Sequence, residues 1–354
     1  MGKFGNVTQT ILIRVLLVIV LLFALTIQSS CVGTVSAEKE STIELKLAHF
    51  FPGTHPAETE FVQGWAKAIK EATNGRVVIT SYPGETLLKA ADIYKGVVDG
   101  VCDIGLSCFS YNPGRFPEIE AFEQPGIVYR NSKVASKVAW EGIQELNPAC
   151  VQDTKLLMVI ATGPGDLFTK KPVRKLEDLA GMQIRATGLT AETLQLIGAV
   201  PIGMPQSEAY EALSKGIVDA NLAPIEVLKT WKHGEVTKYI TRTPFLYNTL
   251  FYVTMNNNKW NSIPEDLQKI IIDTTLKFQD EVGIGLWDKQ NEDALKWAVE
   301  EEGMEVIELP EEEMERWIKA VEPMLDKYIT EKGEAAKKAV ETAKALAEKY
   351  NDIY

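Results

Sequence analysis

Few residues in this chain are of the kinds that catalysis and metal binding require. Its 354 residues include only three histidines, at positions 49, 55 and 233, and these do not form an HExxH pattern. The chain also has no CxxC pair, no GxSxG serine motif, no GxxxxGKS/T loop and no GxGxxG turn. We therefore expect no catalytic residues, no metal site and no cofactor, and we do not expect an enzyme.

Basic residues and cysteines are also scarce. Lysine and arginine number 37 against 49 aspartate and glutamate residues, which gives a net charge of −12. Such a chain offers no basic surface to nucleic acid or anionic lipid, so we expect no nucleic-acid partner, and an anionic ligand must be attracted by a local positive charge. Cys102 and Cys108 would lie roughly 20 Å apart on a strand, too far for a disulfide. We interpret both, together with Cys150, as packing residues with at most one incidental bridge.

The first 37 residues have the pattern of a secretory signal. Lys3 and Arg14 precede an apolar run at 15–27, and small residues lead to Ala37. The apolar run is short for a helix that spans a membrane. We expect export with cleavage after Ala37. Lipid attachment at Cys31 is an alternative, and an uncleaved leader would be a membrane anchor.

Two segments have the alternating pattern of βαβαβ units. In the first, we expect strands at 45–51, 76–82 and 102–109, with helices at 56–73 and 87–96. In the second, we expect strands at 182–187, 200–204 and 217–220, with helices capped by Thr190 and Ser207. The units end alike, in KGVVD at 95–99 and KGIVD at 215–219. Two similar α/β lobes are the predicted architecture.

The chain has two places where it can cross between these lobes. A buried strand at 155–161 is followed by the breaker sequence TGPGD at 162–166, and another strand near 247–255 follows the second unit. Two crossings imply a hinge. The pattern also predicts a long helix at 262–302 that starts with a Ser262 capping box and spans both lobes. The predicted lobes contain residues 38–162 plus 250–290, and 163–249 plus 291–354.

Near the middle of the long helix, Gly283 and Gly285 indicate either a bend or close packing on the sheets. A further strand is expected at 304–309, and amphipathic helices at 311–327 and 332–350 complete the surface.

Arg185 is the main candidate for binding. In open α/β sheets, ligands bind beyond the carboxyl ends of the strands, and Arg185 lies near the end of the strand at 182–187. No aspartate or glutamate occurs within five residues on either side, so the guanidinium is available for an anion unless it is simply a surface charge. His55 follows the first strand and is expected to face the same crevice, whereas His49 lies inside that strand and is expected to be packed.

Five motifs together resemble those of a known transport family. They are LKLAHFFPGTHP, NGRVVITSYPGETL, LEDLAGMQIRATG, AYEALSKGIVDA and NNNKWNSIPEDLQK. Across residues 44–328 the chain resembles the solute-binding proteins of tripartite ATP-independent periplasmic (TRAP) transporters. The resemblance implies a two-lobed α/β fold of the periplasmic binding protein type (type II-like), with a hinge and a long helix that crosses both lobes. It also implies that Arg185 pairs with a ligand carboxylate and that membrane permease subunits are the partners.

The chain departs from this family where other members carry further polar groups. Members that bind sialic acid or dicarboxylates usually have an asparagine where this chain has Ala223, and some have a second arginine where it has Gly165. Asn221 is the nearby amide, and Thr187 lies beside Arg185. Candidate wall residues are Phe50, Phe51, Tyr111, Trp231, Phe245 and Tyr247. We infer a monocarboxylate ligand with an apolar or aromatic body.

Three functions are compatible with these patterns. The first is a TRAP solute-binding protein, monomeric rather than dimeric, that delivers a carboxylate to its permease. The second is a binding protein of similar fold that serves another importer or an extracellular sensor. The third is a secreted enzyme, which would need a set of catalytic residues that the sequence does not contain.

Overall fold

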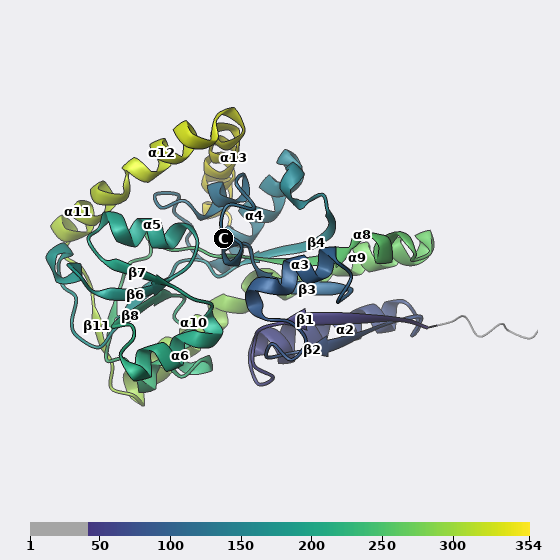
Figure 1. The fold of residues 1–354 in the computed structure, drawn as a ribbon, viewed down its shortest axis with the longest axis horizontal. Helices are drawn as coiled ribbons and strands as arrows, with labels where there is room; N and C mark the ends of the chain where they lie inside the picture. Colours follow the sequence, from purple (N-terminus) through teal and green to yellow (C-terminus); the bar gives the residue numbers. More distant parts are fainter. Residues whose placement is uncertain (1–41) are drawn as a thin grey trace, which may run out of the picture. The chain divides into compact units, whose positions relative to one another are not determined.

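The structure is a computed structural model that describes residues 42–354. The predicted secretory signal therefore lies outside the described residues. Two mixed sheets organise this part of the chain (Figure 1). The first has the strand order β2-β1-β3-β10-β4 and the second the order β11-β9-β5-β8-β6-β7.

The first sheet contains the predicted βα pattern of the N-terminal unit. Its strands are β1 (Ile43–His49), β2 (Val77–Tyr82), β3 (Ile104–Cys108), β4 (Thr154–Ala161) and β10 (Leu250–Asn256). β1 is parallel to β2 and β3, whereas β10 is antiparallel to β3 and β4. The helices that accompany this sheet are α2 (Gln63–Ala72), which continues from a π-helical turn at Ala57–Val62, α3 (Ile93–Val98), α4 (Ser132–Leu146), α8 (Asn257–Asn261) and α9 (Glu265–Glu281).

The second sheet contains the unit around Arg185. Its strands are β5 (Asp166–Thr169), β6 (Gln183–Ala186), β7 (Val200–Gly203), β8 (Ala220–Ala223), β9 (Tyr239–Thr241) and β11 (Glu305–Ile307). β6 is parallel to β7 and β8, as the βαβαβ pattern predicts, and β5 is antiparallel to β8. Its helices are α5 (Leu189–Leu196), α6 (Gln206–Lys215), α7 (Val227–Thr230), α10 (Leu286–Glu300) and α11 (Glu311–Val321).

One strand of the second unit was predicted three residues too early in the sequence. We expected residues 217–220, but β8 runs from Ala220 to Ala223. Gly216 ends α6 with a positive φ of 73°, Ile217 is exposed, and Val218 packs against Leu213 of α6. The apolar residues after the glycine therefore serve the helix and the turn, and the strand begins later.

The three predicted helix caps are also wrong. α5 begins after Gly188 rather than at Thr190, and α6 begins after Pro205. The Ser207 hydroxyl donates instead to Glu85 Oε1 at 3.1 Å. α9 begins after Pro264, because the Ser262 hydroxyl donates to the Lys259 carbonyl at 2.7 Å and so closes α8.

The predicted long helix is broken into two helices. A 3-10 turn at Gly283–Gly285 separates α9 from α10. α9 packs on α2, where Trp65 Nε1 donates to Thr275 Oγ1 at 3.0 Å, while α10 packs on α7. A Cβ atom at Gly283 would lie 3.2 Å from the Phe61 ring. The two glycines therefore provide both the break and the close packing that the sequence indicated.

The C-terminal helix lies with the first sheet. We expected residues 291–354 to belong to the second lobe, but α13 (Glu334–Asn351) packs on α4 (Figure 1). Ala339, Val340 and Ala343 join the hydrophobic core of the first sheet. The alanine-rich face of α13 permits this close approach to α4, and α12 (Pro323–Lys332) connects it to α11.

Candidate functional site

Two lobes meet at a crevice beside the hinge. We call the part of the chain built on the first sheet the first lobe, and the part built on the second sheet the second lobe. Side-chain contacts join them across the crevice: His55 with Glu226 (3.2 Å), Tyr111 with the Gln206 backbone nitrogen (3.0 Å), Glu85 with Ser207 (3.1 Å) and Ser110 with Thr187 (3.5 Å). The structure therefore has the lobes closed on each other.

A small cavity lies inside this crevice. Its lining residues are Phe50, Phe51, Cys108, Tyr111, Thr162, Arg185, Thr187, Gln206, Pro224, Glu226, Val227, Trp231, Tyr247, Thr249 and Phe251. The volume of about 20 Å³ has room for about one water molecule. An organic ligand therefore requires the lobes to open or these side chains to move.

Arg185 is a buried cation in the wall of the cavity. It lies on β6 and is 3% exposed. Its Nε donates to the Met204 carbonyl at 2.9 Å, so part of the guanidinium already has a structural partner. Within residues 42–354, however, no carboxylate forms an ion pair with it. A buried charge is costly unless it is paired, so the guanidinium can accept an anionic ligand.

Several predicted site residues line the same cavity as Arg185. They are Phe51, Tyr111, Thr187, Trp231 and Tyr247, and Phe50 from the predicted wall joins them. The aromatic rings are in contact, with Phe50 stacked on Phe51 at a centroid distance of 4.3 Å. The Tyr111 hydroxyl accepts a hydrogen bond from the Gln206 backbone nitrogen at 3.0 Å. Their contact with a ligand stays a prediction.

The cavity lining excludes four predicted site residues: Phe245, Gly165, Asn221 and His55. Phe245 packs in the hydrophobic core of the second sheet with Leu246 and Ile184, so its ring is not part of the wall. Gly165 has no space for a side chain, because a Cβ atom there would lie 2.5 Å from Tyr247 Cδ1 and 2.7 Å from the Ala223 carbonyl oxygen. Gly165 thus permits the close approach of the Tyr247 ring.

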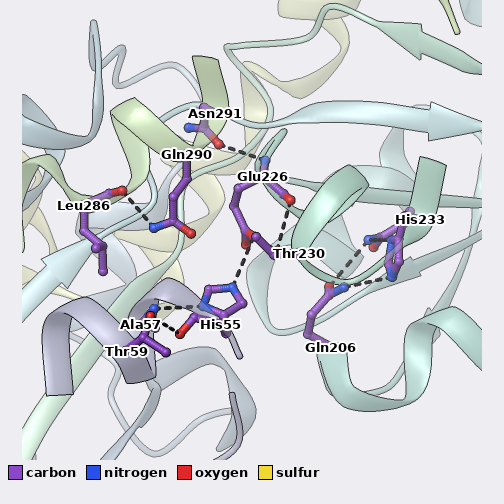
Figure 2. A network of polar contacts seen from close by, with 11 residues as sticks. His55, Ala57, Thr59, Gln206, Glu226, Thr230, His233, Leu286, Gln290 and Asn291 are labelled. Atoms are coloured by element: carbon purple, nitrogen blue, oxygen red, sulfur yellow. Dashed lines mark hydrogen bonds and ion pairs between the residues drawn. The ribbon is translucent and has the colours of Figure 1, made fainter. Parts of the chain in front are cut away.

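A network of amide and imidazole groups lies behind Arg185. Asn221 is fully buried and does not line the cavity, and its Nδ2 lies 3.1 Å from His233 Nδ1. Gln206 Nε2 lies 3.0 Å from His233 Nε2 (Figure 2). Burial, and then the charge of Arg185, lower the pKa of His233 to about 3. His233 is therefore neutral at physiological pH. Gln206 is a second amide at the site that sequence analysis missed.

Glu226 is the second charged residue of the cavity wall. It is 2% exposed, and its Oε2 lies 3.2 Å from His55 Nε2 and accepts a hydrogen bond from the Thr230 hydroxyl (Figure 2). His55 Nδ1 accepts from the Ala57 backbone nitrogen at 2.9 Å, so Nε2 carries the hydrogen that faces Glu226. His55 itself is buried behind the wall, tilted against Phe51 at 4.7 Å.

Sequence analysis missed Glu226 although a signal was present. Glu226 follows Pro224 at the carboxyl end of β8, the edge of the sheet where ligands bind in this fold class.

A larger cavity is lined by residues of α5 and α12 and by Pro113, Gly114 and Glu120. It has a volume of about 550 Å³ and shares Thr187 with the smaller cavity. Its two lysines, Lys327 and Lys332, are exposed, and Lys327 pairs with Glu192 at 3.0 Å. We place the site in the smaller cavity because that cavity contains a buried cation without a carboxylate partner.

Residues 42–354 contain neither a metal site nor a membrane-spanning helix. No cluster of three or more histidine, cysteine, aspartate or glutamate side chains there could hold a metal ion. None of the helices described is both long and apolar enough to cross a membrane. Cys102, Cys108 and Cys150 are free, and the first two are buried, in agreement with their expected role as packing residues.

Comparison with known proteins places the chain among bacterial receptors. Residues 47–332 match the family described as DctP, bacterial extracellular solute-binding protein, family 7. A TRAP periplasmic solute-binding protein from Desulfovibrio salexigens, solved as an open complex, is 31% identical with a TM-score of 0.76, over 88% of this chain and 97% of that one.

Two further relatives differ in their ligands. A TRAP solute-binding protein from a marine metagenome, specific for aromatic acid ligands and solved with metahydroxyphenylacetate, is 29% identical with a TM-score of 0.82, over 87% of this chain and 99% of that one. The C4-dicarboxylate-binding periplasmic protein DctP of Rhodobacter capsulatus is 26% identical over 77% of this chain and 83% of that protein. The fold is therefore shared by receptors for quite different acids.

Proposed function

Since the chain belongs to the bacterial extracellular solute-binding proteins of family 7, the receptors of TRAP transporters, we propose that Arg185 binds the carboxylate of a small aromatic monocarboxylate between the two lobes. The family delivers such solutes to membrane permease subunits, and these are the partners we propose for this chain. We further propose that it acts as a monomer, released by cleavage after Ala37 or held by a lipid at Cys31.

The observation that carries this proposal is the state of Arg185. A guanidinium that is 3% exposed and has no carboxylate partner among the described residues is costly to bury. A planar guanidinium can hold a carboxylate through two parallel hydrogen bonds. Binding of a carboxylate would therefore satisfy the least compensated charge of the cavity.

The lining of the cavity supports an aromatic body and a single carboxylate. Arg185 is the only lysine or arginine among the lining residues, and aromatic rings supply much of the wall. A second ligand carboxylate would be buried without a cation, which costs several kcal/mol. The marine relative specific for aromatic acids supports the same ligand class.

Calorimetric titration with a carboxylate panel tests the proposal. We expect benzoate, phenylacetate and mandelate to bind more tightly than succinate, malate or sialic acid. A ligand at 100 times its dissociation constant should stabilise the fold by about 2.7 kcal/mol, so thermal unfolding provides an independent readout. Submicromolar binding of a C4-dicarboxylate, with weaker binding of every aromatic acid, would contradict the proposal.

A further inference from the structure

We propose that Glu226 forms a second polar subsite of the cavity, which selects aromatic monocarboxylates with a hydroxyl group on the ring. The carboxylate of the ligand would lie at Arg185 and the hydroxyl would donate to Glu226. This inference rests on the proposed function, because the ligand must first be held by Arg185.

The hydrogen bonds of Glu226 leave one of its oxygens free. His55 Nε2 and the Thr230 hydroxyl both face Oε2, and the Asn291 side chain binds the Glu226 backbone nitrogen at 3.0 Å rather than the carboxylate. Oε1 has no hydrogen-bond partner among the described residues. Each carboxylate oxygen accepts about two hydrogen bonds, so Oε1 can receive a hydroxyl from a molecule in the cavity.

The cavity therefore carries charges of opposite sign that do not neutralise each other. Arg185 and Glu226 both line it, yet none of their nitrogen and oxygen atoms approach within the 4.0 Å of an ion pair. Six of the thirteen other lining residues are aromatic. A ligand that fits both charges has an anionic end, an apolar ring and a hydrogen-bond donor.

The carboxylate of Glu226 also disfavours ligands that carry a second carboxylate. A second carboxylate on the ring would meet a like charge in a site with little water, and such a contact disfavours binding. This repulsion adds to the absence of a second cation. The preference for monocarboxylates would then have two causes: repulsion by Glu226, and the lack of a second lysine or arginine in the cavity wall.

Another role for Glu226 must be distinguished from this one. Its contact with His55 joins the two lobes, so the pair could serve only to hold them closed. In that case Glu226 would affect all ligands to the same extent. A hydroxyl subsite instead affects only ligands that carry the hydroxyl, and this difference makes the two roles separable.

The experiment compares phenylacetate with its 2-, 3- and 4-hydroxy derivatives on wild type and Glu226→Gln by calorimetry. We expect at least one hydroxy isomer to bind wild type roughly tenfold more tightly than phenylacetate, the scale of a hydrogen bond to a charged group. In Glu226→Gln this preference should fall to about threefold or less, because the neutral amide is a weaker acceptor. The readout is the ratio of the two affinities, because loss of the contact between Glu226 and His55 would change the affinity for phenylacetate and for its hydroxy derivatives alike.

Two additional measurements test whether the hydroxyl preference depends on the carboxylate of Glu226 and on its charge. Thr230→Val removes a donor to Oε2 and leaves the carboxylate in place, so it should retain the hydroxyl preference. Binding of 3-carboxyphenylacetate should improve in Glu226→Gln relative to wild type.

The inference is overturned if no hydroxy isomer binds wild type better than phenylacetate, a comparison that does not depend on the variant folding. It is also overturned if Glu226→Gln weakens phenylacetate and its hydroxy derivatives equally. If wild type binds none of these acids, the proposed function fails as well. If it binds phenylacetate without a preference for any hydroxy isomer, only the hydroxyl subsite fails.

Discussion

Thr162 and Thr249 are hydrogen-bonded to each other at the point where the chain crosses between the lobes. The Thr162 backbone nitrogen donates to the Thr249 carbonyl at 3.0 Å, and the Thr249 nitrogen donates to Thr162 Oγ1 at 3.3 Å. The two crossings that the sequence predicts therefore lie side by side. Both residues also line the cavity, so a change in the angle of the crossings moves the walls of the site.

Ligand binding should close the lobes about this pair of crossings. A cavity of about 20 Å³ cannot admit an aromatic acid from solution, so the protein must open to bind and close to hide the ligand. We expect small-angle scattering to give a smaller radius of gyration at saturating ligand than without it. Identical scattering curves in both conditions would contradict closure.

Substitution of Gly163 by alanine should destabilise the crossing. Gly163 has a φ of 71°, and a Cβ atom there would lie 2.7 Å from the Ser132 backbone nitrogen. Positive φ costs an alanine about 1 kcal/mol, and contact with backbone adds to this, so we expect a loss of roughly 2 to 4 kcal/mol in urea unfolding. Gly75→Ala is the control, since its φ is 80° and no atom lies within 4 Å. Equal losses in the two variants would show that the contact contributes nothing.

Arg185→Ala should abolish most ligand binding and leave the protein folded. Loss of the partner of a buried carboxylate costs ~2 to 5 kcal/mol, or about 30-fold to several thousand-fold in affinity. Arg185→Lys should recover part of the affinity, because the ammonium keeps the charge without the planar pair of donors. The lost hydrogen bond to Met204 should reduce the free energy of unfolding by about 1 kcal/mol at most.

Calorimetry with the best ligand of the panel, and urea unfolding of each variant, check both parts of this prediction. Affinity of Arg185→Ala within about threefold of wild type would refute the role of the guanidinium. An unfolded variant would refute its structural independence.

Glu123 should make the fold less stable as the pH rises above neutrality. Burial raises the pKa of Glu123 to about 8, although the Leu250 backbone nitrogen donates to its Oε1 at 2.7 Å and so lowers the pKa. The folded state then binds a proton between pH 4.5 and 8 that the unfolded state does not hold, so this residue's contribution to stability is complete below pH 4.5 and is lost progressively up to pH 8.

Glu123 dominates between pH 6.5 and 8, because Asp166, whose pKa burial raises to about 6, has lost most of its proton in the folded state by pH 6.5. The pKa of His233 is lowered, so this histidine has the opposite effect below its ordinary pKa of 6.5. From pH 6.5 to 8, Glu123 should cost wild type roughly 1.5 kcal/mol. Glu123→Gln, which imitates the protonated carboxyl, should show a correspondingly flatter profile. Urea unfolding at several pH values measures both, and parallel profiles would contradict the assignment.

Local patterns predicted most of the elements because each pattern spans only a few residues. The apolar run at 155–161 became β4, and the strand predicted at 76–82 became β2. The position of α13 was not predictable in this way. An amphipathic helix reveals which of its faces is buried, but nothing in its own sequence identifies α4 as the partner.

The site was predicted less completely for the same reason. Arg185 could be found because its isolation from acidic residues is visible within its own strand. Glu226 contacts His55, which lies 171 residues away in the sequence. No local pattern predicts such a contact. Phe245 had the composition and place of a wall residue, yet its ring faces the core of the second sheet, because an aromatic side chain suits either environment.

The absence of space at Gly165 restricts how this receptor can change its ligand during evolution. An arginine introduced there meets the Tyr247 ring and the Ala223 carbonyl, so a single substitution at this position does not yield a second cation for a dicarboxylate. A smaller residue at 247 must come first, and that step removes an aromatic ring from the wall before any new charge is gained. The intermediate would bind neither class of acid well, which separates the two specificities by a fitness valley.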